Sequence, residues 1–142
     1  MYKKILIPLD NSSSDSVIVK HIQSLAKLTG AQLVLVHVAD GFAARLQDQL
    51  NLEDSEEIQK DRQYLQEKEK ELKQKGFSVT AYLASGDPAE KILAIADKEQ
   101  CDLIAMSTHG HRFIKDVILG SVADTIRHRT NIPVLMIRAQ ED

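Results

Sequence analysis

Residues 102–138 read DLIAMSTHGHRFIKDVILGSVADTIRHRTNIPVLMIR, and this stretch decides the fold. An apolar run from Leu103 to Met106 leads into a small polar loop that contains Gly110. Gly120-Ser121 then begins an apolar-periodic helix, and a second apolar run follows from Ile132 to Ile137. Main-chain N–H groups at a glycine turn and at a helix N-terminus can both point toward an anion. The pattern of strand, glycine loop, helix and strand therefore predicts a site that accepts phosphate.

The same alternation of strands and helices continues outward from this stretch. Short apolar runs at Lys4–Pro8 and Ala31–Val38 are typical of strands that are buried on both faces. Between them lies a polar cluster and then a helical stripe, which Gly30 ends at the expected C′ position. Phe77–Ala84 predicts a third strand and Asp102–Met106 a fourth, and the run at the end of the quoted stretch is the fifth.

Two further helices are expected between the second and fourth strands. The residues from Ser55 to Lys75 carry charges of both signs around a narrow apolar seam. This pattern favours a solvated crossover helix over a coiled coil, which needs more heptads. Asp87-Pro88-Ala89-Glu90 predicts a helix start with Asp87 as N-cap, Pro88 at N1 and Glu90 at N3. No role is assigned to residues 39–54.

Buried strands joined by crossover helices predict an α/β fold, with an open parallel sheet of five strands covered by helices on both faces. The length of 142 residues favours a single domain over residues 1–142. In such sheets ligands bind at the carboxyl ends of the strands, where the strand order reverses. The loops that hold Asp10, Val38 and Ser107–Gly110 are therefore expected to meet there.

The composition indicates which kinds of partner the protein binds and in which compartment it is expected. The net charge of −3 gives no basic footprint, so nucleic acid is not expected as a partner. MYKKILIPLD reads as a strand rather than a signal peptide, and no apolar run is long enough to cross a membrane. The protein is therefore expected to be cytoplasmic. Cys101, the one cysteine, is interpreted as structural because no His and Asp arrangement suggests an activated thiol.

Four segments together resemble the universal stress proteins of the UspA superfamily: KKILIPLD, LVLVHV, GDPAEKI, and STHG followed after nine residues by GSVADTIRHRTNIPVLMIR. The resemblance covers essentially the whole chain. It implies a Rossmann-like, adenine nucleotide α-hydrolase-like fold with strand order 3-2-1-4-5. Nucleotide-binding members carry a glycine, two residues, a glycine, nine residues, and a glycine followed by Ser or Thr. Gly110 and Gly120-Ser121 fit that spacing, whereas Ser107 stands in place of the first glycine.

The resemblance implies ATP as the ligand, with Mg²⁺ bound through the phosphates. The base would lie at the ends of the first two strands, the sugar beside the end of the fourth, and the phosphates between the glycine loop and the last helix. The residues implied to contact the nucleotide are Pro8, Leu9, Asp10, Val38, Met106, Ser107, Gly110, His111, Arg112, Gly120, Ser121 and Val122. Arg112 and Lys115 would add positive charge near the phosphates.

Several of these residues also have purely structural interpretations. Asp10 is a candidate helix cap, although Asn11 and Ser12 can supply that cap without it. Ser121 is a candidate N-cap as well as a phosphate contact. His109 and His111 lack a third ligand for a metal site, so no metal ligand is assigned. His37 is interpreted as a core or near-core histidine with a satisfied nitrogen.

The favoured function is a small stress-response protein that binds ATP and acts as a nucleotide-responsive module. No catalytic residue is assigned, because no Ser, His and Asp set can be assembled, and any ATP cleavage is expected to be slow. The resemblance also implies a homodimer through the edge strand Ile132–Ile137. The alternative is a dimeric interaction protein of the same fold that does not bind nucleotide.

Overall fold

The computed structural model describes residues 1–39, 56–108 and 114–139, with side chains of the last range given from residue 121 onward. Its sheet has the order β3-β2-β1-β4-β5, and every pair of neighbouring strands is parallel. The strands are β1 (Lys4–Pro8), β2 (Gln32–Ala39), β3 (Val79–Ser85), β4 (Leu103–Thr108) and β5 (Val134–Arg138). The predicted parallel sheet and its strand order are confirmed.

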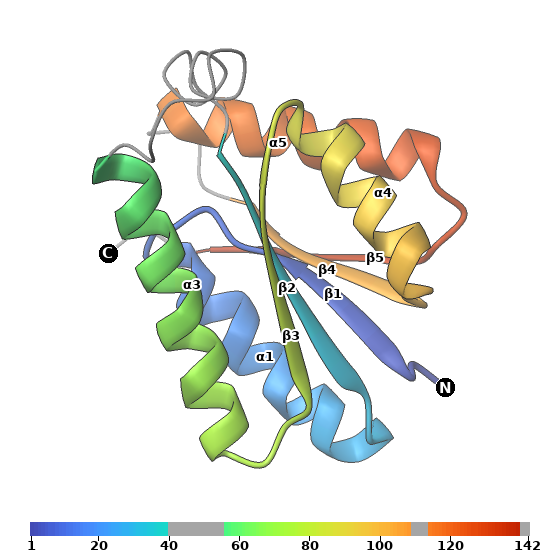
Figure 1. Ribbon diagram of the computed structural model, residues 1–142. Helices are drawn as coiled ribbons and strands as arrows, with labels where there is room; N and C mark the ends of the chain where they lie inside the picture. Colours follow the sequence, from blue (N-terminus) through green and yellow to red (C-terminus); the bar gives the residue numbers. More distant parts are fainter. Residues whose placement is uncertain (40–55, 109–113, 140–142) are drawn as a thin grey trace.

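The described helices cover both faces of the sheet (Figure 1). They are α1 (Ser14–Thr29), α3 (Glu56–Gln74), α4 (Pro88–Glu99) and α5 (Ile114–Arg129). Helices α1 and α3 lie against one face, and α4 and α5 lie against the other (Figure 1). The core consists of two apolar layers because alternate residues of each strand point to opposite faces. In β2, for example, Leu33 and Leu35 join the layer under α1 and α3, whereas Val34 and Val36 join the other layer.

Local signals in the sequence account for several helix boundaries. Gly30 ends α1 in the left-handed conformation, with φ of 73°, as its position predicted. Asp87 caps α4 because its carboxylate accepts a 2.9 Å hydrogen bond from the N–H of Glu90, and Pro88 follows at the first helical position. The predicted cap of this helix is therefore confirmed.

The start of the last helix differs from the prediction. Helix α5 begins at Ile114, six residues before Gly120, so the prediction that it begins near Gly120 is wrong. Ile114, Val117 and Ile118 repeat at helical spacing with no glycine or proline among them, which favours helix over this run. Gly120 and Ser121 consequently lie inside the helix rather than at its N-terminus.

The two outer strands are β3 and β5. Strand β5 begins at Val134 rather than at Ile132, and Met136 in its middle is 44% exposed. Within the described ranges, the helices are all too short or too polar to cross a bilayer.

Candidate functional site

The strand order reverses beside β1, and both neighbours of this strand extend past its carboxyl end. The pairing of β1 with β2 ends at Pro8 and Val36, and its pairing with β4 ends at Leu6 and Ile104. Both neighbours continue past these points, β2 to Ala39 and β4 to Thr108. The carboxyl ends of β2 and β4 therefore flank the region past the end of β1, which we call the space beyond β1, and parallel sheets bind ligands at such positions.

The hydrogen-bond pattern shows which main-chain groups face this space. In a parallel strand, alternate residues direct their N–H and C=O groups to opposite neighbours. In β2, the C=O of Val36 accepts a 2.8 Å hydrogen bond from Leu9, whereas the C=O of Ala39 accepts from Gly86 beyond β3. Val38 therefore faces the β1 side of β2, beyond the last β1 residue that pairs with this strand.

Strand β4 shows the same alternation. The N–H of Ile104 bonds to Pro133 and the C=O of Thr108 accepts from Ala139, so the even-numbered residues of β4 face β5. The main chain of Ser107 consequently faces the β1 side, past the end of the pairing with β1. Val38 and Ser107 thus direct peptide groups toward this region from its two sides.

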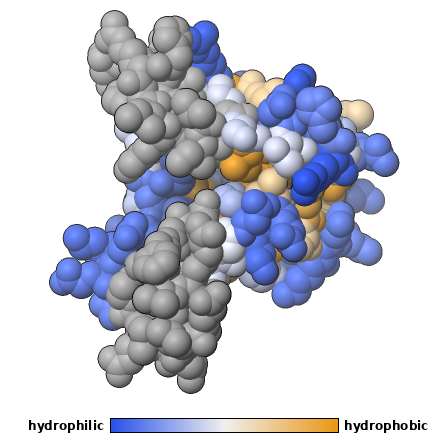
Figure 2. All heavy atoms as spheres, turned by 90° about the horizontal axis from the view of Figure 1, so that it is seen from above, coloured by the Kyte–Doolittle hydropathy of each residue, from blue (hydrophilic) through white to orange (hydrophobic). Residues whose placement is uncertain are grey.

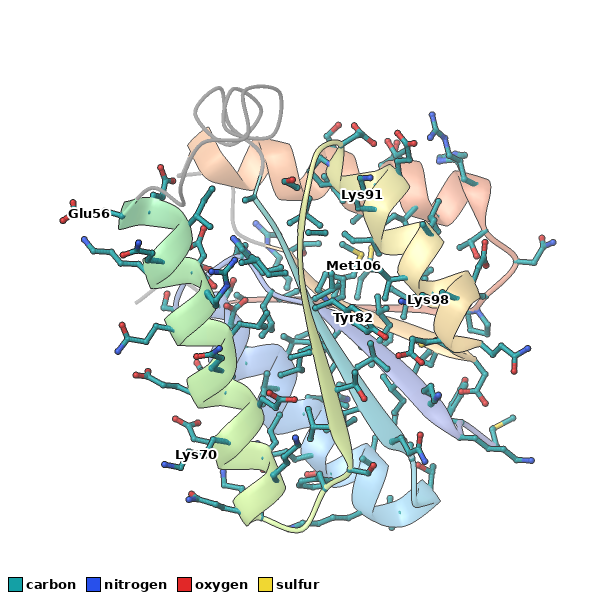
Figure 3. All side chains as sticks on the ribbon, viewed as in Figure 1. Glu56, Lys70, Tyr82, Lys91, Lys98 and Met106 are labelled. Carbon is teal, nitrogen blue, oxygen red and sulfur yellow. The ribbon has the colours of Figure 1, made fainter. Side chains whose placement is uncertain are left out.

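At the carboxyl ends of β2 and β4, the side chains of Val38, Met106 and Ser107 pack against the helices on either face of the sheet. Met106 is fully buried and lies between the sheet and α4 (Figure 3), among apolar residues of α4 and α5. Val38 is partly buried in the same layer. Figure 2, which views the molecule from above, shows an apolar area among hydrophilic side chains. The Ser107 side chain is only 2% exposed and lies on the opposite face of β4, the face of Leu103 and Ala105.

A buried carboxylate fixes the loop that follows β1. Asp15 of α1 is 1% exposed, and its two oxygens accept hydrogen bonds from the main-chain N–H groups of Asp10 and Asn11, at 3.1 and 2.9 Å. Asn11 has a positive φ of 65°, a conformation that Asn adopts more readily than most residues. The side chain of Asp10 accepts hydrogen bonds from the N–H and hydroxyl of Ser12, at 3.0 and 2.5 Å. These contacts lie within the loop, and the N-cap position of α1 is Ser13, so they do not make Asp10 the cap of that helix.

The environment of Asp15 changes its ionisation. Burial raises its pKa from 3.8 to about 6, and the nearby Asp10 carboxylate also raises it. The hydrogen bonds from the Asp10 main chain and from Tyr64 act in the opposite direction. Tyr64 of α3 donates its hydroxyl proton to Asp15 Oδ2 at 2.8 Å, and burial together with the Asp15 charge raises the pKa of Tyr64 above its usual value. Helices α1 and α3 thus meet at this loop.

A histidine and a second aspartate hold the same loop from the other side. Nδ1 of His37 lies 2.8 Å from the carbonyl oxygen of Leu9, and Nε2 lies 3.2 Å from Oδ2 of Asp61 on α3. Asp61 Oδ1 also accepts a short hydrogen bond from the side-chain amide of Asn11. His37 is 9% exposed, which confirms its interpretation as a near-core histidine.

The structure brings together only part of the predicted site. Pro8, Leu9, Asp10, Val38, Met106 and Ser107 all lie at the carboxyl ends of β1, β2 and β4. Gly110, His111 and Arg112 lie outside the described residues. Val122 is 9% exposed and packs in the α4 and α5 layer, whereas Ser121 is exposed. Ser121 cannot be the N-cap of α5, since the helix begins before it.

Sequence reasoning missed Asp15 and Asp61, although a signal for each was present. Asp15 precedes Ile18 by three residues and Ile22 by seven, so it lies on the apolar stripe of α1. Asp61 stands between Ile58 and Leu65, on the narrow seam of α3. A carboxylate on an apolar stripe is expected to have polar partners in the core.

Cys101 and metal coordination are the two other chemistries that the residue types raise. Cys101 is 6% exposed, and burial raises the pKa of its thiol to about 11, so it lacks the thiolate character of a reactive cysteine. In the described part of the chain, no group of three or more His, Cys, Asp or Glu side chains is arranged to hold a metal ion.

Comparison with known proteins identifies the family. The profile of the Universal stress protein family matches residues 1–138. The chain belongs to the universal stress protein family. Universal stress protein MJ0577 of Methanocaldococcus jannaschii is 30% identical, with 97% of this chain and 96% of the relative covered. The resemblance that the sequence motifs indicated is thus confirmed for the family as a whole.

Solved structures of other universal stress proteins share this fold. The structure of MJ0577 aligns with a TM-score of 0.79 and 31% identity, covering 100% of this chain and 99% of that one. A universal stress protein from Archaeoglobus fulgidus in complex with dAMP aligns with a TM-score of 0.70 and 20% identity, covering 96% and 98% of the two chains. One in complex with cAMP aligns with a TM-score of 0.68 and 20% identity, covering 96% and 97%. This universal stress protein therefore has the fold of proteins that were solved with adenine nucleotides.

Proposed function

We propose that this universal stress protein binds an adenine nucleotide, ATP with Mg²⁺, at the carboxyl ends of its strands, and acts as a nucleotide-responsive dimeric module. The observation that carries the proposal is the position of Val38 and Ser107, whose peptide groups face the space beyond β1 from both sides. A peptide group offers one donor and one acceptor, and the edge of adenine carries both kinds of group as well. The complexes of related proteins with dAMP and cAMP support the same ligand class.

The environment of these peptide groups suits a nucleoside. Val38, which is only partly buried, supplies apolar surface on the α4 side, and Pro8 ends the strand beside which the base would rest. The Asp10 carboxylate is within the same loop and is a suitable acceptor for a ribose hydroxyl. The phosphates would extend toward Gly110, His111, Arg112 and the Gly120–Val122 segment. Magnesium would be held by the phosphates and its own waters, which is its usual mode of binding with nucleotides.

Titration calorimetry on protein stripped of ligand by unfolding and refolding tests the proposal. We expect ATP with Mg²⁺ to bind, adenosine to bind more weakly, and GTP to bind least, because the base contacts come from fixed main-chain groups. Absence of heat at millimolar ATP would reject nucleotide binding and favour the alternative, an interaction protein without a nucleotide. Mass spectrometry of small molecules released on denaturing the freshly purified protein gives an independent answer.

A matched pair of variants localises the site. Val38→Asp places a negative charge where the base would lie, so we expect at least about a tenfold loss of ATP affinity. Val17→Asp makes the same change on α1 at a residue that is 37% exposed, and it is expected to bind ATP like the unchanged protein. Thermal unfolding of both variants separates loss of binding from loss of folding. Equal affinities of the two variants would place the nucleotide elsewhere.

We also propose that two copies associate through β5. This strand pairs with β4 along one edge, and Met136 remains 44% exposed on it. Edge strands with apolar side chains tend to be covered by a partner, and a second copy of the same strand is complementary to it by symmetry. The proposal predicts a dimer in analytical ultracentrifugation at micromolar concentration.

A further inference from the structure

One buried side chain of α1 holds the main chain of the loop after β1. Oδ1 of Asp15 accepts the N–H of Asp10 at 3.1 Å, and Oδ2 accepts the N–H of Asn11 at 2.9 Å. Oδ2 also accepts the hydroxyl proton of Tyr64 at 2.8 Å, which joins the loop to α3. Two successive peptide groups of the loop therefore take their direction from a single carboxylate.

This loop adjoins the space beyond β1. Leu9, the residue after β1, still bonds to β2, because its N–H donates to the C=O of Val36 at 2.8 Å. Asn11 has a positive φ of 65°, a conformation that needs support in a residue other than glycine. Asp15 itself is only 1% exposed, so it does not touch a ligand in that space. Any effect of Asp15 on a ligand therefore passes through the main chain of the loop.

The two main-chain contacts are strongest when Asp15 is ionised. An N–H group can only donate, and each oxygen of the Asp15 carboxylate receives one of the two. Whichever oxygen takes a proton, one N–H then faces a hydroxyl oxygen. Hydrogen bonds to an ionised acceptor are about twice as strong as those between neutral groups. The hydroxyl of Tyr64, in contrast, can donate or accept and so keeps a contact in both states. Protonation thus weakens the hold on the loop in particular.

We propose that Asp15 is a positioning residue of the nucleotide site, and that its ionised carboxylate holds the main chain of Asp10 and Asn11 in the geometry that binds the ligand. This inference rests on the proposed nucleotide binding. Neutral Asp15 holds the loop less firmly, so nucleotide affinity falls as Asp15 takes up a proton. Burial raises the pKa of Asp15 to about 6, so the loss occurs as the pH falls from about 7 to about 5.

Other ionisable side chains face this part of the loop, and those that the structure describes are Asp10, His37, Asp61 and Tyr64. The sheet contributes apolar side chains on this face, such as Ile7 of β1 and Ala105 of β4. ATP itself also titrates between pH 5 and pH 8. Proteins that differ only at position 15 share all of these titrations. The ratio of their dissociation constants at one pH therefore isolates the contribution of Asp15.

Asp15→Asn imitates the protonated carboxyl group at every pH. An amide has one acceptor oxygen and one NH₂ group, so one of the two main-chain N–H groups loses its acceptor. We expect this variant to bind ATP with Mg²⁺ about tenfold more weakly than the unchanged protein at pH 8, and only about twofold to threefold more weakly at pH 5. Repulsion between the Asp15 carboxylate and the phosphates has the opposite sign, because its removal would tighten binding at pH 8.

Asp97→Asn makes the same change at an exposed residue of α4 and should match the unchanged protein at every pH. Thermal unfolding of each variant shows whether it is folded at the pH of the measurement. A ratio for Asp15→Asn that is the same at pH 5 and pH 8 overturns the inference, even if the variant binds poorly. Tighter binding by Asp15→Asn at pH 8 overturns it as well.

The hydroxyl of Tyr64 sets the pH at which the change occurs. Its hydrogen bond favours the ionised carboxylate, so Tyr64→Phe should raise the pKa of Asp15. The fall in ATP affinity should then have its midpoint about one pH unit higher than in the unchanged protein. A loss that is equal at every pH, with no change of midpoint, would mean that the titrating group is not Asp15.

The ligand-free protein distinguishes failure of this inference from failure of the proposed function. In NMR spectra, the carboxyl carbon of Asp15 and the amide groups of Asp10 and Asn11 should change together with a midpoint at about pH 6. If they do and ATP does not bind at any pH, the carboxylate holds the loop and the proposed function fails. Amide groups that do not follow the Asp15 carboxyl group contradict the inference, whatever the result with ATP.

Discussion

The hydroxyl group of Tyr64 donates a 2.8 Å hydrogen bond to Oδ2 of Asp15, and this contact joins α3 to the start of α1. Asp15 uses the same oxygen to accept the N–H of Asn11 and its other oxygen to accept the N–H of Asp10. Tyr64 is therefore one of three donors that stabilise a carboxylate with almost no exposure to water. The loop at the proposed nucleotide site depends on a charge held inside the protein.

Removing that donor should destabilise the fold. Tyr64→Phe leaves the buried carboxylate with one hydrogen bond fewer, and we expect the free energy of unfolding to fall by about 1–3 kcal/mol. Urea unfolding at pH 7 measures the change. Tyr2→Phe is the matched control, since the Tyr2 hydroxyl has no hydrogen-bond partner in the part of the chain that the structure describes, and it should change stability by no more than about 0.5 kcal/mol. Equal effects of the two variants would mean that the Tyr64 contact contributes nothing.

The ionisation of Asp15 makes stability depend on pH. Its pKa is about 6 in the folded protein against 3.8 as the ordinary value, so the folded state keeps this proton longer than the unfolded state does. The stabilising contribution of the protonated group is complete below pH 3.8 and is lost as pH rises toward 6. Over that window, the carboxyl group lowers the free energy of unfolding by about 3 kcal/mol.

Urea unfolding of the unchanged protein and of Asp15→Asn between pH 4 and pH 7 measures this effect. The amide of the variant does not titrate, so its stability relative to the unchanged protein should improve with rising pH by about 3 kcal/mol. At any one pH, the difference in the free energy of unfolding between the two proteins also includes the altered hydrogen bonds of the amide. The variation of that difference from pH 4 to pH 7 therefore reports the titration of Asp15. A difference that stays constant from pH 4 to pH 7 would show that Asp15 titrates alike in both states.

The proposed dimer through β5 can be disrupted without disturbing the sheet. The N–H of Ala139 and the C=O of Pro133 bond to β4, so odd-numbered residues of β5 face that strand and the N–H of Met136 faces outward. Met136→Pro removes only this outward donor, a change that edge strands tolerate. We expect the variant to sediment as a folded monomer, whereas Met136→Leu, which keeps the N–H, stays dimeric. A dimer that persists with proline is formed by another surface.

The serine that replaces the first motif glycine should not block nucleotide binding. The Ser107 side chain is 2% exposed and lies on the face of β4 that carries Ala105, so it adds little bulk at the edge of the strand that faces β1. Ser107→Gly is expected to leave the dissociation constant for ATP within about threefold and to lower the free energy of unfolding by about 1 kcal/mol, since glycine weakens a strand. An affinity gain above about tenfold would show that the side chain crowds the ligand.

Phosphate contact at Gly120 and Ser121 requires a change in α5. Inside a helix, N–H groups beyond the first turn bond to the carbonyl four residues earlier, so these two amides are already used. If the phosphates bind them, the segment from Ile114 to Leu119 must lose its helical conformation. Carbon chemical shifts in NMR should then move from helical toward coil values with ATP but not with adenosine. Unchanged shifts at saturating ATP would place the phosphates elsewhere.

The sequence predicted most of the fold because its signals are local and repeated. Strand β1 was predicted at Lys4–Pro8 and is found there, since an apolar run bounded by proline has few alternatives. Helix α5 begins earlier than predicted because a glycine followed by serine resembles a helix start, whereas the helical spacing from Ile114 onward is a weaker signal. The Gly-Ser pair therefore misled where the capping motif at Asp87 and the glycine at position 30 did not.

The site was predicted in outline, but not the side chains that organise it. Topology alone places Val38 and Ser107 beside the end of β1, which is why the sequence pattern could find them. The contacts of Asp15, Tyr64, His37 and Asp61 join residues that are far apart in sequence. Such pairings depend on how α3 packs on the sheet, and a single sequence carries no direct signal for that packing. Only the placement of Asp15 and Asp61 on apolar stripes pointed to them.

The buried thiol of Cys101 has a practical consequence. With a pKa of about 11, it stays protonated at neutral pH and does not compete for maleimide reagents. A cysteine introduced at an exposed site such as Leu28, which is 86% exposed, would then carry a fluorophore at one defined position. The native chain is thus ready for single-molecule fluorescence without first removing its own cysteine.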